Sequence, residues 1–259
     1  MRIMMIGDVI GKPGRIAVRK LVPDLRSEYG IDLVIANGEN AAGGIGLTPD
    51  TADELLESKV DLLTSGNHIW AHKEMVSSID SYQQILRPMN YPKGVVGRGY
   101  AIVKNALVVN LIGRTFIGNF DCPFRAIDNL LKELGDDKPA ITVIDFHAEA
   151  TSEKIALGWY LNGRVSSVTG THTHVGTIDA KILSKGTAYI TDIGMVGPDE
   201  SVIGDDIDAV INRFLTQMPH RISVGKGRVN FNSVMIDIDE KTGKATSFSR
   251  IDREVDCNG

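Results

Sequence analysis

Side chains that can bind metal ions recur where predicted strands end. The apolar run at residues 60–65 ends in Gly66-Asn67-His68, so an amide oxygen and an imidazole follow a short β-type segment. In open α/β sheets, ligands gather at the tips of strands. Similar groups end other predicted strands, namely Asp8, Glu39, Asn40, His147, His172 and His174. Oxygen and nitrogen ligands at successive strand tips predict a two-metal hydrolase site.

Each of these residues also has a structural interpretation when taken alone. Asp8 could cap the next segment, Asn67 could hold a turn, and a lone His147 could be a satisfied core histidine. The pair His172 and His174 is more specific, because residues i and i+2 of a strand face the same side. Together the residues form a mixed oxygen and nitrogen set that suits Mn, Fe, Zn or Mg. Two ions about 3.5–4 Å apart need a bridging carboxylate, and we predict Glu39 in that position.

The elements that must position these residues begin with alternating strands and helices. This alternation is typical of a parallel sheet. The predicted strands cover residues 2–6, 32–36 and 60–65, and the predicted helices cover 15–29, a segment starting at 49, and 69–79.

The second half of the chain has a different pattern, with more hairpins. Predicted hairpins pair residues 99–103 with 107–112, 180–183 with 187–191, and 229–238 with 245–251; further strands cover 140–146 and 165–169, and further helices cover 127–134, 152–161 and 206–217. The candidate ligands are shared between the two halves. We therefore expect a single α/β domain, residues 1–259, with two packed sheets flanked by helices.

Composition excludes several other classes. The net charge of −5 gives no support for a sequence-independent DNA binder or a cationic membrane-surface protein. No apolar run approaches the roughly 20 residues that span a bilayer. Cys122 and Cys257 form no CxxC motif, which argues against a disulfide framework and against a thiolate metal site. We expect a cytoplasmic protein without a membrane role.

The motifs around the candidate ligands resemble those of the calcineurin-like metallophosphoesterases. Five occur in the right order: Gly7-Asp8, Gly38-Glu39-Asn40, Gly66-Asn67-His68, His147, and Gly-Thr-His-Thr-His at residues 170–174. Segments 37–42, 65–70, 146–154 and 191–195 are similar in particular to the bacterial YmdB-type 2′,3′-cyclic-nucleotide phosphodiesterases. The resemblance covers nearly the whole chain. It implies a metallophosphoesterase-like four-layer α/β/β/α sandwich of two mixed sheets flanked by helices.

The resemblance also implies the ligand sets of two metal ions, with iron or manganese preferred over magnesium or zinc. Most metallophosphoesterases have Asp-x-His in the first motif and Asp at the bridge, whereas this chain has Ile10 and Glu39; the YmdB-type branch shares both departures. Asn40 then takes the place of the missing imidazole. One ion is expected at Asp8, Glu39, Asn40 and His174, and the other at Glu39, Asn67, His147 and His172.

The implied reaction is hydrolysis of a small phosphodiester, especially a 2′,3′-cyclic nucleotide. A hydroxide between the two ions would attack phosphorus, and His68 would protonate the leaving alkoxide or only stabilise the phosphoryl oxygens. The resemblance further implies a homo-oligomer and an indirect link to RNA turnover.

Three alternatives stay open. A phosphomonoesterase or a nuclease would use the same site on another substrate. An amidohydrolase also uses His-x-His, but normally on the first strand of a barrel rather than late in the chain. A non-enzymatic, metal-bound regulatory scaffold would be favoured by lost ligands, yet all seven candidate ligands and His68 are present.

Overall fold

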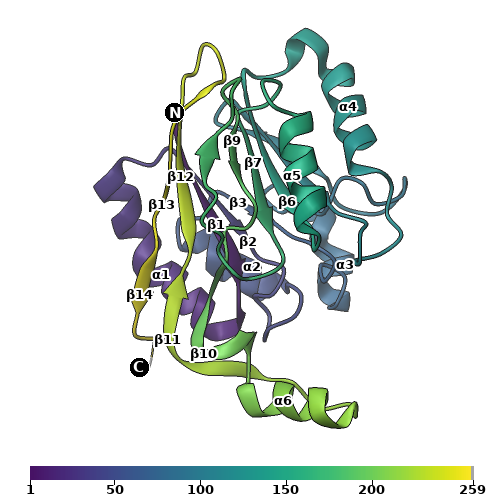
Figure 1. The fold of residues 1–259 in the computed structure, drawn as a ribbon, viewed down its shortest axis with the longest axis vertical. Coiled ribbons are helices and arrows are strands. Elements are labelled where there is room, and N and C mark those ends of the chain that lie inside the picture. The colour runs from purple at the N-terminus through teal and green to yellow at the C-terminus, as the bar shows by residue number, and fades with distance from the viewer. Residues whose placement is uncertain (258–259) are drawn as a thin grey trace.

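The computed structural model describes residues 1–257, in which two β-sheets lie face to face between outer helices (Figure 1). The predicted domain also includes residues 258 and 259, which lie outside the described residues. The eight-stranded sheet contains β1 (Arg2–Val9), β2 (Leu33–Asn37), β3 (Leu62–Thr64), β10 (Met195–Asp205), β11 (Val224–Phe231), β12 (Ser233–Ile238), β13 (Ala245–Arg250) and β14 (Arg253–Val255). The six-stranded sheet contains β4 (Tyr100–Val103), β5 (Ala106–Ile112), β6 (Ile141–His147), β7 (Ser167–Thr171), β8 (Lys181–Ile182) and β9 (Ala188–Ile190).

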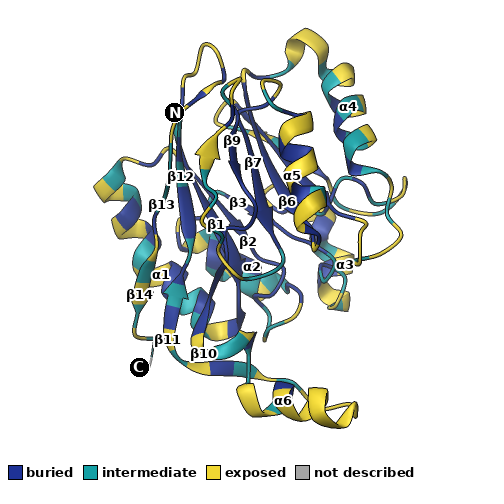
Figure 2. Ribbon diagram, viewed as in Figure 1, coloured by how far each residue is buried: buried dark blue, intermediate teal, exposed yellow. Residues whose placement is uncertain are grey.

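Helices cover the outer faces of both sheets. The helices are α1 (Gly11–Tyr29), α2 (Pro49–Glu57), α3 (Lys73–Ser78), α4 (Pro123–Leu134), α5 (Thr151–Tyr160) and α6 (Ile207–Thr216), and two short 3-10 turns cover Ile79–Ser81 and Gly135–Asp137. Helices α1, α2 and α3 pack on the eight-stranded sheet, and α4 and α5 pack on the six-stranded one. The outer faces of α4 and α5 are exposed, and α6 projects from the body (Figure 2). None of the helices within residues 1–257 is both long and apolar enough to cross a membrane.

The side chains of the strands pack into three apolar layers, one between the two sheets and one beneath the helices on each outer face. Successive strand residues point to opposite faces, so Ile3 and Met5 of β1 pack between the two sheets. Met4 and Ile6 instead pack toward α1. The central strands are therefore buried on both faces, which explains their nearly continuous apolar sequence.

The six-stranded sheet divides its residues in the same way. Val108 and Val143 contact the first sheet, whereas Leu107 and Ile144 pack beneath α4 and α5. The resulting order of layers is helix, sheet, sheet, helix, which confirms the predicted α/β/β/α sandwich.

Parallel pairing brings the strand tips of each sheet to one edge. β1 pairs in parallel with β2, and β2 with β3; β5, β6, β7 and β9 are also mutually parallel in that order. Antiparallel strands complete both sheets, so each is mixed. The carboxyl ends of β1 to β3 and of β6 and β7 carry the candidate ligands.

Several predicted boundaries are wrong. The predicted helix at residues 69–79 begins only at Lys73, because residues 67–70 form a turn closed by the Ala71 amide and the His68 carbonyl. The helix predicted at 15–29 begins earlier, at Gly11. The predicted strand at 229–238 is two strands, which separate at Asn232. Strand β10 was not predicted at all.

Candidate metal centre

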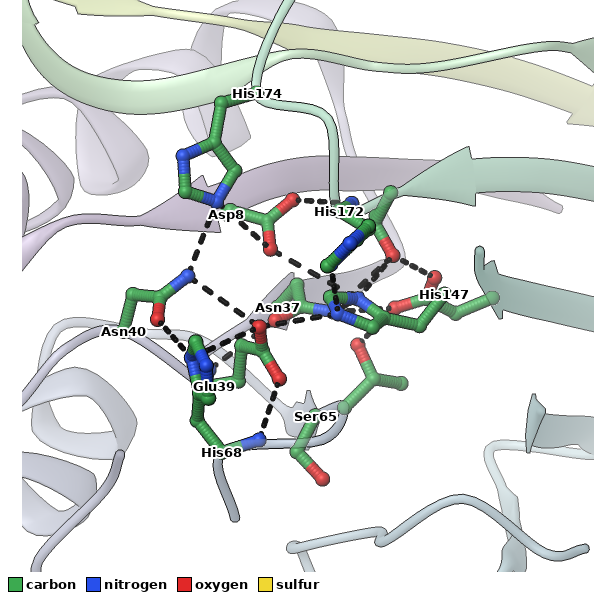
Figure 3. A network of polar contacts seen from close by, with 12 residues as sticks. Asp8, Asn37, Glu39, Asn40, Ser65, His68, His147, His172 and His174 are labelled. Carbon is green, nitrogen blue, oxygen red and sulfur yellow. Dashed lines mark hydrogen bonds and ion pairs between the residues drawn. The ribbon is translucent and has the colours of Figure 1, made fainter. Parts of the chain in front are cut away.

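The strand tips of both sheets converge on one polar cluster. Figure 3 shows seven of the predicted side chains turned toward one another, namely Asp8, Glu39, Asn40, His68, His147, His172 and His174. Asp8 lies near the end of β1, and Glu39, Asn40 and His68 follow β2 and β3 of the same sheet. The histidines at 147, 172 and 174 come from the ends of β6 and β7 in the other sheet. The centre is therefore assembled only when the two sheets pack together.

Three side chains form the centre of this cluster. Glu39 Oε1 lies 3.0 Å from His147 Nε2, and the same nitrogen lies 3.0 Å from His172 Nδ1. The ligand atoms of the three residues all lie within 4.8 Å of one another. This group could hold a metal ion.

A hydroxyl and a carboxylate fix the ring of His147. Thr171 Oγ1 donates its hydrogen to Asp145 Oδ1 at 2.7 Å, and it lies 3.0 Å from His147 Nδ1. Because the single hydroxyl hydrogen is already used, Nδ1–H of His147 must be the donor to Thr171. In the neutral ring, the lone pair of Nε2 then faces Glu39. Outer contacts of this kind are usual behind metal-binding histidines.

Oxygen atoms outside the cluster likewise orient the imidazoles of His172 and His174. His172 Nε2 lies 3.0 Å from Glu149 Oε2, and His174 Nδ1 lies 2.6 Å from the carbonyl oxygen of Ile203. A carboxylate and a carbonyl only accept hydrogen bonds, so these nitrogens carry the hydrogen. In the neutral rings, the lone pairs of His172 Nδ1 and His174 Nε2 consequently face into the cluster.

The prediction that His172 and His174 converge through strand alternation is wrong. Strand β7 ends at Thr171, and both histidines lie beyond it with positive φ values, 99° and 64°. They reach the centre from different sides: His172 faces His147, whereas His174 Nε2 lies 3.1 Å from the amide nitrogen of Asn40. Backbone reversal after the strand, rather than a shared strand face, brings them together.

Two buried oxygen atoms of the candidate ligands lack a hydrogen-bond donor among residues 1–257, and this tests whether the site fits a cation. Asp8 is fully buried, and its Oδ2 accepts the backbone N–H of His172 at 3.1 Å. Asp8 Oδ1 and Asn67 Oδ1 are buried without any hydrogen-bond partner among the described residues. Asp8 Oδ1 lies 3.7 Å from His174 Nε2, another lone-pair atom in the neutral ring. Buried oxygen atoms normally have partners, and a cation would satisfy these.

Burial and neighbouring charges strongly shift the pKa values of the side chains in the cluster. Burial raises the pKa of Asp8 to about 6. Burial also opposes ionisation of Glu39, but the His147 imidazole outweighs it and lowers the pKa of Glu39 to about 2. The Glu39 carboxylate in turn overcomes the burial of His147 and raises its pKa to about 9. Burial, with His147 beside it, lowers the pKa of His172 to about 3. A metal cation would take the place of the proton that Glu39 and His147 share.

His68 lies at the margin of the centre. Its backbone N–H donates to Glu39 Oε2 at 3.2 Å, and its Nδ1–H donates to Asn40 Oδ1 at 3.0 Å. The side chain is 37% exposed and lines a cavity of about 270 Å³. Asn40 turns its amide nitrogen, not its oxygen, toward His174. The amide would have to rotate before its oxygen could join His174 as a ligand.

Several contributing residues were not identified from the sequence. The outward partners Thr171 and Glu149 stand next to or close to candidate ligands, at positions 171 and 149, so their proximity in sequence was a usable signal. The carbonyl of Ile203 gave no signal, because any residue supplies a carbonyl. Asp205 also lines the cavity, and it lies in the unpredicted strand β10.

Comparison with known proteins gives relatives over nearly the full length. A 2′,3′-cyclic-nucleotide 2′-phosphodiesterase of Bacillus subtilis (strain 168) is 49% identical over 255 residues, which cover 97% of this chain and 96% of the relative. The crystal structure of a hypothetical protein from Thermus thermophilus matches with a TM-score of 0.92 and 43% identity, over 99% of this chain and 100% of that one.

A second solved structure, described as a novel phosphatase from Mycoplasma pneumoniae, also matches with a TM-score of 0.92, at 33% identity over 99% of this chain and 94% of that one. The family model described as YmdB-like protein matches residues 4–251. Since this match includes every candidate ligand, the chain belongs to the YmdB-like protein family.

Proposed function

We propose that this protein is a dinuclear-metal phosphodiesterase that hydrolyses 2′,3′-cyclic nucleotides. The observation that carries the proposal is the orientation of the three imidazoles, each held by an outer oxygen so that a lone pair faces the cluster. Metal ions prefer such fixed, inward-facing ligands. The substrate class is supported by the activity named for the Bacillus subtilis relative.

Two overlapping ligand sets would hold the ions. We assign Asp8, Glu39, Asn40 and His174 to one ion, and Glu39, Asn67, His147 and His172 to the other. Glu39 belongs to both sets, and its side chain is completely buried. When bound, such ions activate a water molecule and neutralise charge on the phosphoryl oxygens.

The residues of the chain then have separate tasks. Water adds to phosphorus, and the bond from phosphorus to the 2′ oxygen breaks, which leaves a 3′-phosphomonoester. In its protonated form, His68 has Nδ1 3.6 Å from Glu39 Oε1 and gives the Nε2 proton to the departing 2′ oxygen. Holding one ring nitrogen in place aims the other, which favours this role over general stabilisation of the phosphoryl oxygens.

A phosphomonoesterase is a second candidate, because the related Mycoplasma pneumoniae structure is described as a phosphatase. The homo-oligomer, the single domain, the cytoplasmic location and the link to RNA turnover stay predictions of the sequence.

The test uses protein stripped of metal and reloaded with Mn or Fe. Turnover of 2′,3′-cyclic AMP, bis-p-nitrophenyl phosphate and p-nitrophenyl phosphate is compared for wild type, Asp8→Asn and His68→Ala, and bound metal is measured for each. We expect Asp8→Asn to lose metal and activity together. We expect His68→Ala to keep its metal and to lose about 10²–10⁴-fold in kcat on the diesters, the usual value of a general acid.

Two outcomes would contradict these assignments. Metal-loaded wild type that hydrolyses neither diester is not a phosphodiesterase, and exclusive turnover of the monoester would establish the second candidate. Loss of metal from His68→Ala would place His68 among the ligands rather than at the leaving group.

A further inference from the structure

The cavity beside the candidate metal centre extends past His174 to a wall of different chemistry. This wall consists of Ile10, Gly44, Ile203 and Asp205. Glu149 lines the part of the cavity where it contacts His172. Apolar surface with one convergent polar group is typical of a small-molecule subsite. A phosphate at the metal centre would leave this wall for the rest of the ligand.

A bend in β10 contributes Ile203 and Asp205 to the wall. The pairing of β10 with β11 shifts register between Glu200 and Asp205. Within the bend, Ile203 has φ +51°, a genuine outlier for a β-branched residue. Its carbonyl accepts the hydrogen bond from His174 Nδ1, so the strained backbone is held by a candidate metal ligand. Strain of this kind concentrates at functional sites.

The apolar part of the wall is closely packed. Ile203 is 49% exposed, and Ile10 is buried beside it. A Cβ on Gly204, next in the chain, would lie 2.9 Å from Cγ2 of Ile10, so the bend packs closely on that side chain. At Gly44 a Cβ would lie 3.1 Å from Val224, and φ is +98°. Both glycines are therefore required by close packing within the protein, Gly204 against Ile10 and Gly44 against Val224.

Asp205 supplies the polar group of the wall. Among residues 1–257, its carboxylate accepts no hydrogen bond and forms no ion pair. Burial raises its pKa, as expected for a carboxylate partly removed from water. An ionised carboxylate is only an acceptor, so a ligand group bound to it must present N–H or O–H donors. Of the four nucleobases, guanine alone presents two adjacent donors, N1–H and the 2-amino group, on its Watson–Crick edge.

We propose that Ile10, Gly44, Ile203 and Asp205 form a nucleobase subsite in which the Asp205 carboxylate accepts two hydrogen bonds from guanine. The proposal rests on the proposed function, because the phosphate of a 2′,3′-cyclic nucleotide at the metal centre directs the base toward this wall. Enzymes that bind single bases hold them between apolar side chains and read the Watson–Crick edge in this way.

The first experiment measures kcat/KM of metal-loaded wild type, Asp205→Ala and Asp205→Asn. The substrates are 2′,3′-cyclic GMP, 2′,3′-cyclic UMP and bis-p-nitrophenyl phosphate, which has no base. We expect wild type to prefer the guanine substrate and Asp205→Ala to lose about 10–100-fold on that substrate alone, the value of hydrogen bonds to a charged group. Asp208→Ala is the matched control, because Asp208 is exposed on α6 and does not line the cavity.

A second experiment does not depend on turnover. Calorimetry of 3′-GMP and 3′-UMP binding to the metal-loaded protein should show tighter binding of 3′-GMP, and only that ligand should be weakened by Asp205→Ala. Equal affinities for both ligands would overturn the subsite, whether or not the protein proves to be a phosphodiesterase. An equal loss on bis-p-nitrophenyl phosphate would also overturn it, since Asp205 would then act on the reaction and not on the base.

Discussion

At the residue scale, the chemistry of the centre depends on which nitrogen of each histidine carries hydrogen. Thr171 shows how this is decided. Its hydroxyl donates to Asp145, which leaves only its oxygen to face His147 Nδ1. Asn37 and Thr64 also donate to Asp145 Oδ2, so the carboxylate is fixed from several sides. The ring of His147 is therefore oriented by a buried network, with Nε2 toward Glu39.

Thr171→Val should weaken metal binding without removing a ligand. Valine keeps the volume but cannot accept the Nδ1 hydrogen, and losing such an outer contact typically costs about 10–100-fold in metal affinity. Affinity is measured by titration of the stripped protein with Mn. The matched control is Thr169→Val, because within residues 1–257 the Thr169 hydroxyl bonds only to the carbonyl of Ile144. Equal affinities of the two variants would show that Thr171 does not position His147.

The residue types at the centre could be predicted, because they stand at or shortly after the ends of apolar strands in the sequence. Their tautomers could not. Glu149 and Ile203 fix His172 and His174 through contacts that depend on loop conformation, and Ile203 uses a backbone atom. Asp8, Glu39 and Asn67 keep their predicted ligand roles as proposals.

At the element scale, one glycine at a strand tip permits the close approach of Glu39 and His147. Gly66 follows β3, and a Cβ there would lie 2.2 Å from both Glu39 Oε2 and His147 Nε2. Gly38 follows β2 in the same sheet, yet a Cβ there would meet Leu47 at 3.5 Å, an ordinary contact. The two glycines therefore differ in function although both precede candidate ligands.

Gly66→Ala should abolish metal binding and turnover, because the added methyl group displaces the carboxylate or the imidazole. Gly38→Ala should retain both properties, since its methyl group fits beside Leu47. Bound metal per chain and turnover of bis-p-nitrophenyl phosphate are the measurements, with circular dichroism to show that both variants fold. Full metal content in Gly66→Ala would mean that the tip of β3 does not press on the centre.

Strand β10 was the main element that sequence patterns did not reveal. Residues 195–205 include Gly197, Pro198 and a run of polar residues, which break the apolar alternation of a strand. Its pairing comes from distant segments, β1 and β11. The bend that forms the cavity wall lies in this strand, so the proposed base subsite was also beyond prediction.

At the scale of the whole molecule, a buried ion pair joins a helix to the connection between the sheets. Lys154 of α5 lies 2.6 Å from Asp192, and both side chains are almost completely buried. The carboxylate also accepts the backbone N–H and the hydroxyl of Thr173, and the N–H of Gly194. Asp192 thus fixes the loop that carries His172 and His174.

Lys154→Ala should lower the free energy of unfolding by about 3–5 kcal/mol, because it leaves the Asp192 carboxylate buried without its cation. Urea denaturation of the metal-free protein measures this, which keeps metal binding out of the comparison. Lys226→Ala, at an exposed position of β11, is the control and should change stability by no more than about 0.5 kcal/mol. Equal stabilities would show that water reaches Asp192 in solution.

By itself, the sequence determined the strand and helix alternation, the apolar strands buried on both faces, and the residue types at their tips. These follow from local rules, since periodicity and turn residues act over a few positions. Only the tertiary structure decided how His172 and His174 reach the centre, which atoms orient Glu39 and His147, and where β10 bends. Such features depend on contacts between the two sheets. Segments remote in the sequence supply those contacts, so no local pattern encodes them.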